Sequence, residues 1–195
     1  IAKCPLGVDP KTLPEDVMPK VEARPHDEIP KEFLTMHHLE QYPDTTFLVG
    51  GFNGVNQLNW IFSRMGGKRD DAYNVRLGKD VHGGVIKSRE NIRHAKFVIL
   101  YEFGKEDKGV YKAFRVKNIG ELTKQQMIDT GYINPQHDAY LCYFFDEEIT
   151  LGEFDIKKII EADKMKHEAD SKQKKEYAEG QPVYMSGREL IKFRL

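Results

Sequence analysis

The sequence has few cysteines, almost no net charge and no long apolar run. Its 195 residues include only Cys4 and Cys142, so neither a disulfide framework nor a thiolate zinc cluster is expected. No apolar run approaches the roughly 18 to 20 residues that span a bilayer. The first ten residues also lack the order of charged and apolar residues found in a signal peptide. These absences predict a water-soluble cytoplasmic protein without a membrane partner.

The two signs of charge nearly cancel, with 30 basic and 31 acidic side chains and a formal net charge of −1. No global field therefore attracts polyanions from a distance, and any contact with nucleic acid must use a local basic face. The length suits one domain, or one domain with an extension.

Prolines recur through residues 1–30 and predict an extended arm, which a short helix over 30–42 follows. Residues 43–195 are expected to form one α+β domain. The apolar patterns predict strands at 45–49, 72–77, 96–103, 109–117 and 140–145, helices at 55–62, 88–94, 123–130 and 155–177, and a short returning strand within 182–194. We expect Gly50 and Gly51 to end the first strand, and 96–103 to pair with 109–117 as a central hairpin.

Acidic and histidine side chains offer only weak metal sites. His37 and His38 are adjacent, so on a helix they project about 100° apart and cannot chelate one ion. The acidic groups could hold magnesium in a small nuclease, but no spacer with Glu-x-Lys accompanies them. These groups are Asp70, Asp71, Glu102 and the run Asp146, Glu147 and Glu148. We expect no catalytic residue, metal or cofactor within this chain, and a partner domain or subunit would supply any chemistry.

The glycine stretches at 50–54 and 83–84 could cradle a phosphate, yet no Lys-Ser or Lys-Thr follows them in P-loop register. A basic interval with interleaved aromatics is more informative, because basic side chains neutralise phosphate and aromatic faces stack on unpaired bases. It combines Arg64, Lys68, Arg69, Arg76, Lys79, Lys87, Arg89, Arg93 and Lys96 with Trp60, Phe62, Tyr73 and Phe97.

Several stretches in this order resemble the EVE and YTH branches of the PUA-like barrels. They are Phe47-Leu-Val-Gly-Gly51, Ala72-Tyr-Asn-Val-Arg-Leu77, Ser88-Arg-Glu-Asn-Ile92, Phe97-Val-Ile-Leu-Tyr101, Gly109-Val-Tyr-Lys-Ala113 and Gln181-Pro-Val-Tyr-Met-Ser-Gly-Arg188. The resemblance implies a small barrel of five to six strands, flanked by helices, over residues 43–195. It also implies a pocket that receives a modified base, in a bacterial defence or RNA-processing system.

Carried over by position, the resemblance assigns the pocket to Gly51, Phe52, Asn53, Tyr73, Asn74, Arg76 and Tyr101, and the backbone contacts to Lys68, Arg69, Lys87, Arg89 and Arg93. The second strand of YTH domains carries a cage tryptophan near the position of Arg76, whereas Trp60 lies on the preceding predicted helix. The leading hypothesis is a non-enzymatic module that binds DNA or RNA. A small metal-dependent nuclease and a peptide or small-molecule interaction domain are the alternatives.

Overall fold

The computed structural model describes residues 39–63, 70–77, 90–170, 177 and 180–195. The chain divides into two units, 1–31 and 32–195, and all of the described residues belong to the second. The predicted arm and most of the helix expected at 30–42 lie outside the described residues. Leu39 and Glu40 are helical, as the sequence predicts for this segment.

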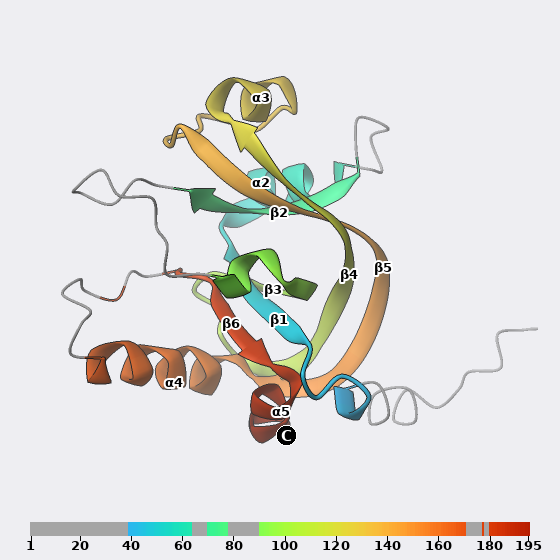
Figure 1. The fold of residues 1–195 in the computed structure, drawn as a ribbon, viewed down its shortest axis with the longest axis vertical. Helices are drawn as coiled ribbons and strands as arrows, with labels where there is room; N and C mark the ends of the chain where they lie inside the picture. Colours follow the sequence, from blue (N-terminus) through green and yellow to red (C-terminus); the bar gives the residue numbers. More distant parts are fainter. Residues whose placement is uncertain (1–38, 64–69, 78–89, 171–176, 178–179) are drawn as a thin grey trace, which may run out of the picture. The chain divides into compact units, whose positions relative to one another are not determined.

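Six strands form one mixed sheet, in the order β2-β5-β4-β3-β1-β6 (Figure 1). Only β1 and β3 pair in parallel, and the other neighbours are antiparallel. The strands are β1 (Thr46–Phe52), β2 (Asp71–Leu77), β3 (Ala95–Glu102), β4 (Lys108–Thr123), β5 (Ala139–Asp155) and β6 (Val183–Ser186). The helices of the described part are α2 (Gly54–Ile61), α3 (Lys124–Asp129), α4 (Ile156–Ala169) and α5 (Gly187–Leu190), with 3-10 turns η4 (Glu90–Arg93) and η5 (Ile191–Phe193). The predicted α+β class is confirmed.

The predicted hairpin is also confirmed, because β3 and β4 pair antiparallel from Phe97 opposite Arg115 to Ile99 opposite Ala113. Beyond β3, β4 continues alongside β5, which has 17 residues where the sequence predicts six. Figure 1 shows these two strands side by side as two long curved ribbons, with α3 at one end of the pair. Register shifts between Val110 and Lys112 and on both sides of Val116 interrupt their ladder. Such irregularities bend a strand pair, so they account for the curvature.

Acidic residues that the sequence analysis considered as magnesium ligands instead continue β5. Glu147 and Glu148 form ion pairs of 3.0 Å and 2.6 Å with Arg115 and Lys112 of β4. Arg115 stands directly opposite Glu147, whereas Lys112 reaches Glu148 diagonally across the strand pair. Opposite charges on neighbouring strands stabilise the pairing, which allows a polar run to remain in the sheet. Sequence periodicity could not reveal this extension, because the partner strand supplies the compensating charges.

Both faces of the β1 and β3 pair are apolar. Phe47 and Val49 of β1 enter one core cluster together with Ile156 and Ile159, so α4 covers that face. Leu48 points to the other side, into a second cluster that β2, β5, α2 and α3 complete. The sheet is therefore strongly curved, and β2 at one edge faces β1 across the second cluster.

Gly50 and Gly51 do not end β1 as expected, since the strand continues to Phe52. A Cβ atom at Gly50 would lie 2.4 Å from Cζ of Tyr73, and one at Gly51 would lie 2.9 Å from Cζ of Tyr101. The Tyr73 hydroxyl donates to the Gly51 carbonyl at 3.0 Å. Glycine is needed here because two tyrosine rings press directly on the strand.

The sheet is not closed into the predicted barrel. Within the described residues no backbone ladder joins β2 to β1 or β6, the strands that it faces across the curl. Tyrosine side chains make the connection instead. Besides the bond from Tyr73, the hydroxyl of Tyr143 in β5 donates to the carbonyl of Ile92 at 2.6 Å and lies 3.0 Å from the Tyr184 hydroxyl of β6.

The close approach of Tyr73 makes Gly50 a sensitive position. We predict that Gly50→Ala lowers the free energy of unfolding by about 2 to 3 kcal/mol, as overpacking of a core does. Gly120→Ala is a matched control in β4, because its Cβ atom would meet Phe144 at an ordinary 3.5 Å. Urea unfolding of both variants gives the comparison, and equal losses would contradict the contact with Tyr73.

Candidate functional site

The two tyrosines assigned to the base pocket lie on opposite faces of β1. Gly51 stands opposite Tyr101 in the parallel ladder with β3, whereas the Tyr73 ring covers Gly50, the next residue, from the other face. Both tyrosines are about 97% buried. No single cavity on one face of the sheet can therefore hold both rings, and the pocket implied by the resemblance is not formed in this way.

Burial also extends the pH range over which both hydroxyl groups stay protonated. It raises the pKa of Tyr101 to about 12, with a further contribution from Glu106. Burial raises the pKa of Tyr73 still further above the ordinary value, helped by the neighbouring Tyr184. A neutral hydroxyl can donate to a carbonyl, which is the role that Tyr73 has at Gly51.

Asn74 and Arg76 occupy the other face of β2. Asn74 stands opposite Cys142 and Arg76 opposite Tyr140 in the antiparallel ladder with β5. Asn74 is 7% exposed, and its Oδ1 atom has no hydrogen-bond partner within the described part of the chain. Arg76 is exposed. Of the seven assigned pocket residues, Asn53 and Arg76 are therefore the two whose side chains are exposed.

The residues assigned to the nucleic-acid backbone are mostly not described. Lys68, Arg69, Lys87 and Arg89 lie outside the described residues. Arg93 forms an ion pair with Glu121 of β4. Phe62 and Phe97, two aromatics of the same interval, pack in the core against Phe114 and Phe47.

A hollow of about 280 Å³ lies where α2 meets the loop after α3, and we call it the amide-aromatic hollow. It contains carboxamide, aromatic and aliphatic side chains and no charged residue. Its lining residues are Asn53, Asn56, Gln57, Trp60, Tyr132 and Ile133.

Local hydrogen bonds shape the α2 side of this hollow. The chain leaves β1 at Asn53 and turns into the helix at Gly54, which has φ 69°. Asn53 occupies the N-cap position without a side-chain capping bond, and its backbone N–H donates to Oε1 of Gln57 at 2.7 Å. The Gln57 amide nitrogen is then oriented as a donor, and the Asn53 carboxamide is not used for capping.

The aromatic wall is fixed in a similar way. Trp60 Nε1 donates to Oγ1 of Thr130 at 3.0 Å, and that hydroxyl donates to the Met127 carbonyl at 2.6 Å. The Tyr132 ring meets the indole edge-on, with 4.9 Å between ring centroids. The indole N–H is thereby occupied, so the wall contributes aromatic surface and the amides contribute the polar contacts.

Three side chains, Tyr132, Tyr140 and His137, form an aromatic strip that leads from this hollow to Arg76. Tyr132 packs on Tyr140 at 5.7 Å between centroids, and Tyr140 stands opposite Arg76 in the ladder. His137 contacts the same Tyr140 ring at 6.0 Å. Burial and the charge of Arg76 lower the pKa of His137, which favours its neutral form at neutral pH. Arg76 is therefore the permanent cation of the strip.

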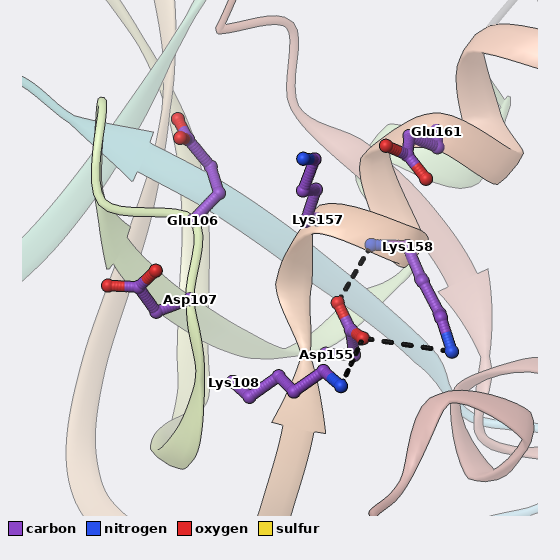
Figure 2. A pocket seen from close by; sticks show the side chains of 7 residues that line it. All are labelled: Glu106, Asp107, Lys108, Asp155, Lys157, Lys158 and Glu161. Atoms are coloured by element: carbon purple, nitrogen blue, oxygen red, sulfur yellow. Dashed lines mark hydrogen bonds and ion pairs between the residues drawn. The ribbon is translucent and has the colours of Figure 1, made fainter.

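A larger hollow of about 700 Å³ lies between the turn after β3 and the start of α4, and we call it the charged groove (Figure 2). Every residue that lines it is charged. They are Glu106, Asp107, Lys108, Asp155, Lys157, Lys158 and Glu161. With four acids and three lysines, the groove has no excess of positive charge to attract a phosphate.

Asp155 makes most of the contacts within the charged groove. It is 4% exposed, it caps α4, and its Oδ1 accepts the backbone N–H of Lys158 at 3.1 Å. Its Oδ2 lies 3.8 Å from the ammonium groups of Lys108 and Lys158, as Figure 2 shows. These contacts neutralise a buried carboxylate at a helix start, so the arrangement serves stability.

The acids considered for a nuclease do not form a metal site. Asp70 pairs with Lys117 and Glu102 with Lys105, each at 2.8 Å. Among the described residues, no group of three or more His, Cys, Asp and Glu side chains is placed to hold an ion.

The described helices also include none that is long and apolar enough to cross a membrane.

Comparison with known proteins finds no matching family model, no matching curated protein and no matching solved structure. The resemblance to PUA-like domains therefore stays a prediction from the sequence.

Sequence reasoning missed most of the amide-aromatic hollow. No role was predicted from the sequence for Asn56, Gln57, Tyr132 or Ile133. One available signal was the segment after Gly131, in which two large apolar side chains precede Asn134. A second signal was Asn53-Gly54, a carboxamide followed by glycine at a predicted strand-to-helix junction.

Two substitutions test whether Asp155 serves the helix start. We predict that Asp155→Ala lowers the free energy of unfolding by about 1 to 2 kcal/mol, because the N-cap acceptor is lost. Asp155→Asn keeps an acceptor, and the two exposed lysines stay solvated, so its loss should be much smaller. Thermal or urea unfolding measures both, and a large loss in Asp155→Asn would show that the ion pairs dominate.

The raised pKa of Tyr101 predicts a loss of stability in alkali. Its folded-state pKa of about 12 lies above the ordinary 10.0, so the stabilisation is complete below pH 10 and declines as the pH rises toward 12. Tyr101→Phe removes this group, and the variant should lose less stability over the same interval. Urea midpoints across that range provide the measurement, and identical declines would contradict the prediction.

Proposed function

We propose that this protein is a nucleic-acid-binding module that holds one unpaired base in the amide-aromatic hollow. The absence of any charged residue from the lining of this hollow carries the proposal. A neutral lining favours an uncharged group, such as a base, over a phosphate, because an ion would lose hydration there without a partner.

The polar groups of the hollow match the chemistry of a base edge. Bases present donors and acceptors side by side, and carboxamides such as those of Asn53 and Asn56 offer one of each. Tyr132 is half-buried and leaves part of its ring toward the hollow, where a base can stack. Arg76 lies at the other end of the aromatic strip and would contact a neighbouring phosphate.

This proposal moves the binding site relative to the one that the resemblance implies. The base would lie against α2 and the loop after α3, outside the curled sheet, whose interior Tyr73 and Tyr143 occupy. In this proposal Asn53 keeps its pocket role, Arg76 changes from a pocket residue to a phosphate contact, and Tyr73 and Tyr101 have structural roles. Recognition of a modified base and membership of a defence or RNA-processing system remain predictions from the resemblance.

Trp60 makes the proposal directly testable because it is the only tryptophan in the chain and lines the hollow. Titration with single-stranded DNA and RNA should change its fluorescence saturably. Asn56→Ala should weaken binding to the preferred base by about 1 to 3 kcal/mol, the discrimination that a good amide pair supplies. Binding to other bases should change less.

Arg76→Ala should weaken binding to all sequences alike and reduce the salt dependence by about one counterion. Lys164→Ala is the matched control, since Lys164 lies on α4 and faces Glu168 at 3.9 Å. The proposal fails if no strand binds at low salt, or if Arg76→Ala and Lys164→Ala have the same effect on binding. Binding of a peptide, and of no strand, would favour the interaction-domain alternative.

A further inference from the structure

Ile133 is an exposed aliphatic side chain at the edge of the amide-aromatic hollow. It lines the hollow and yet is 63% exposed. Its neighbour Asn134 has φ 51°, the only positive φ of a non-glycine residue in the described ranges. A single exposed isoleucine is common on protein surfaces, so its position beside a base-sized neutral hollow is the informative feature.

The loop that carries Ile133 is held firmly at both ends. The backbone N–H of Tyr132 donates to the Met127 carbonyl at 3.0 Å, and the Tyr132 ring packs between Trp60 and Tyr140. On the far side, the His137 backbone N–H donates to the Tyr140 hydroxyl at 3.1 Å. Ile133 is therefore presented on a preformed loop, and little conformational entropy would be lost on contact with a partner.

A base can enter the hollow from a duplex only after it leaves the stack. Extrusion costs a few kcal/mol and opens a gap between the neighbouring base pairs. Proteins offset this cost by inserting an apolar side chain between base steps. Ile133 has the chemistry and exposure for this role, and it stands next to the hollow that would receive the extruded base.

We propose that the partner is a base-paired nucleic acid from which one base is extruded into the amide-aromatic hollow while Ile133 occupies the vacated gap. This inference rests on the proposed function and adds the form of the partner. It makes Ile133 a positioning residue, which acts on the neighbouring base pairs and leaves the polar contacts to the amides of α2.

The test uses duplexes that carry the fluorescent base 2-aminopurine next to the target base, where its emission rises when the target base leaves the stack. Wild-type protein should raise the emission, and a mismatch opposite the target base should tighten binding, because less pairing is lost. Ile133→Ser should weaken duplex binding about tenfold, as expected for loss of a partly buried aliphatic contact. It should weaken single-strand binding by a clearly smaller factor, because there Ile133 is only one of the residues that line the hollow.

Val55→Ser is the matched control. Val55 is a similarly exposed aliphatic residue of α2, at 66%, and does not line the hollow. Equal weakening of single-strand and duplex binding by Ile133→Ser would overturn the inference, because Ile133 would then be a wall of the hollow. Single-strand binding without duplex binding would also overturn it and leave the proposed function intact. Failure to bind either form would reject both.

Discussion

The contact of Tyr73 with Gly50 and Gly51 is the constraint on which the arrangement depends. The ring lies so close to β1 that no Cβ atom fits at Gly50, and its hydroxyl satisfies the Gly51 carbonyl. Tyr101 presses on Gly51 from the other face. A strand held between two rings fixes the distance between β1 and β2 without a backbone ladder, which explains how the sheet curls and still remains open.

The position of the candidate site follows from this contact. β1 passes directly into α2 through Asn53 and Gly54, and β2 packs against the same helix, so the fixed distance between the strands also places α2. Trp60 then reaches Thr130 at the end of α3, which joins the helix to the loop that carries Tyr132 and Ile133. The hollow is thus formed by segments about 75 positions apart in the sequence.

Many charged side chains in the described part of the chain pair with one another. The basic residues of β4 pair with acids of β5 and with Asp70, and the lysines of the charged groove surround the carboxylate that caps α4. With a net charge of −1, affinity for nucleic acid could not depend on a general attraction to phosphate. This distribution is consistent with a site that relies on base stacking and amide contacts, with Arg76 as its local cation.

The sequence by itself determined the α+β class and the existence of most elements, because apolar periodicity reflects local backbone geometry, but it did not indicate α5 and η5. It thereby indicated the β3–β4 hairpin and the positions of α2 and α3. Tertiary structure decided the length of β5, since the acids Glu147 and Glu148 needed partners on β4. It also placed Gly50 and Gly51 inside a strand and put Tyr73 and Tyr101 on opposite faces. These outcomes depend on which side chains contact each other across the sheet, and the pattern of residues along the chain does not specify those contacts.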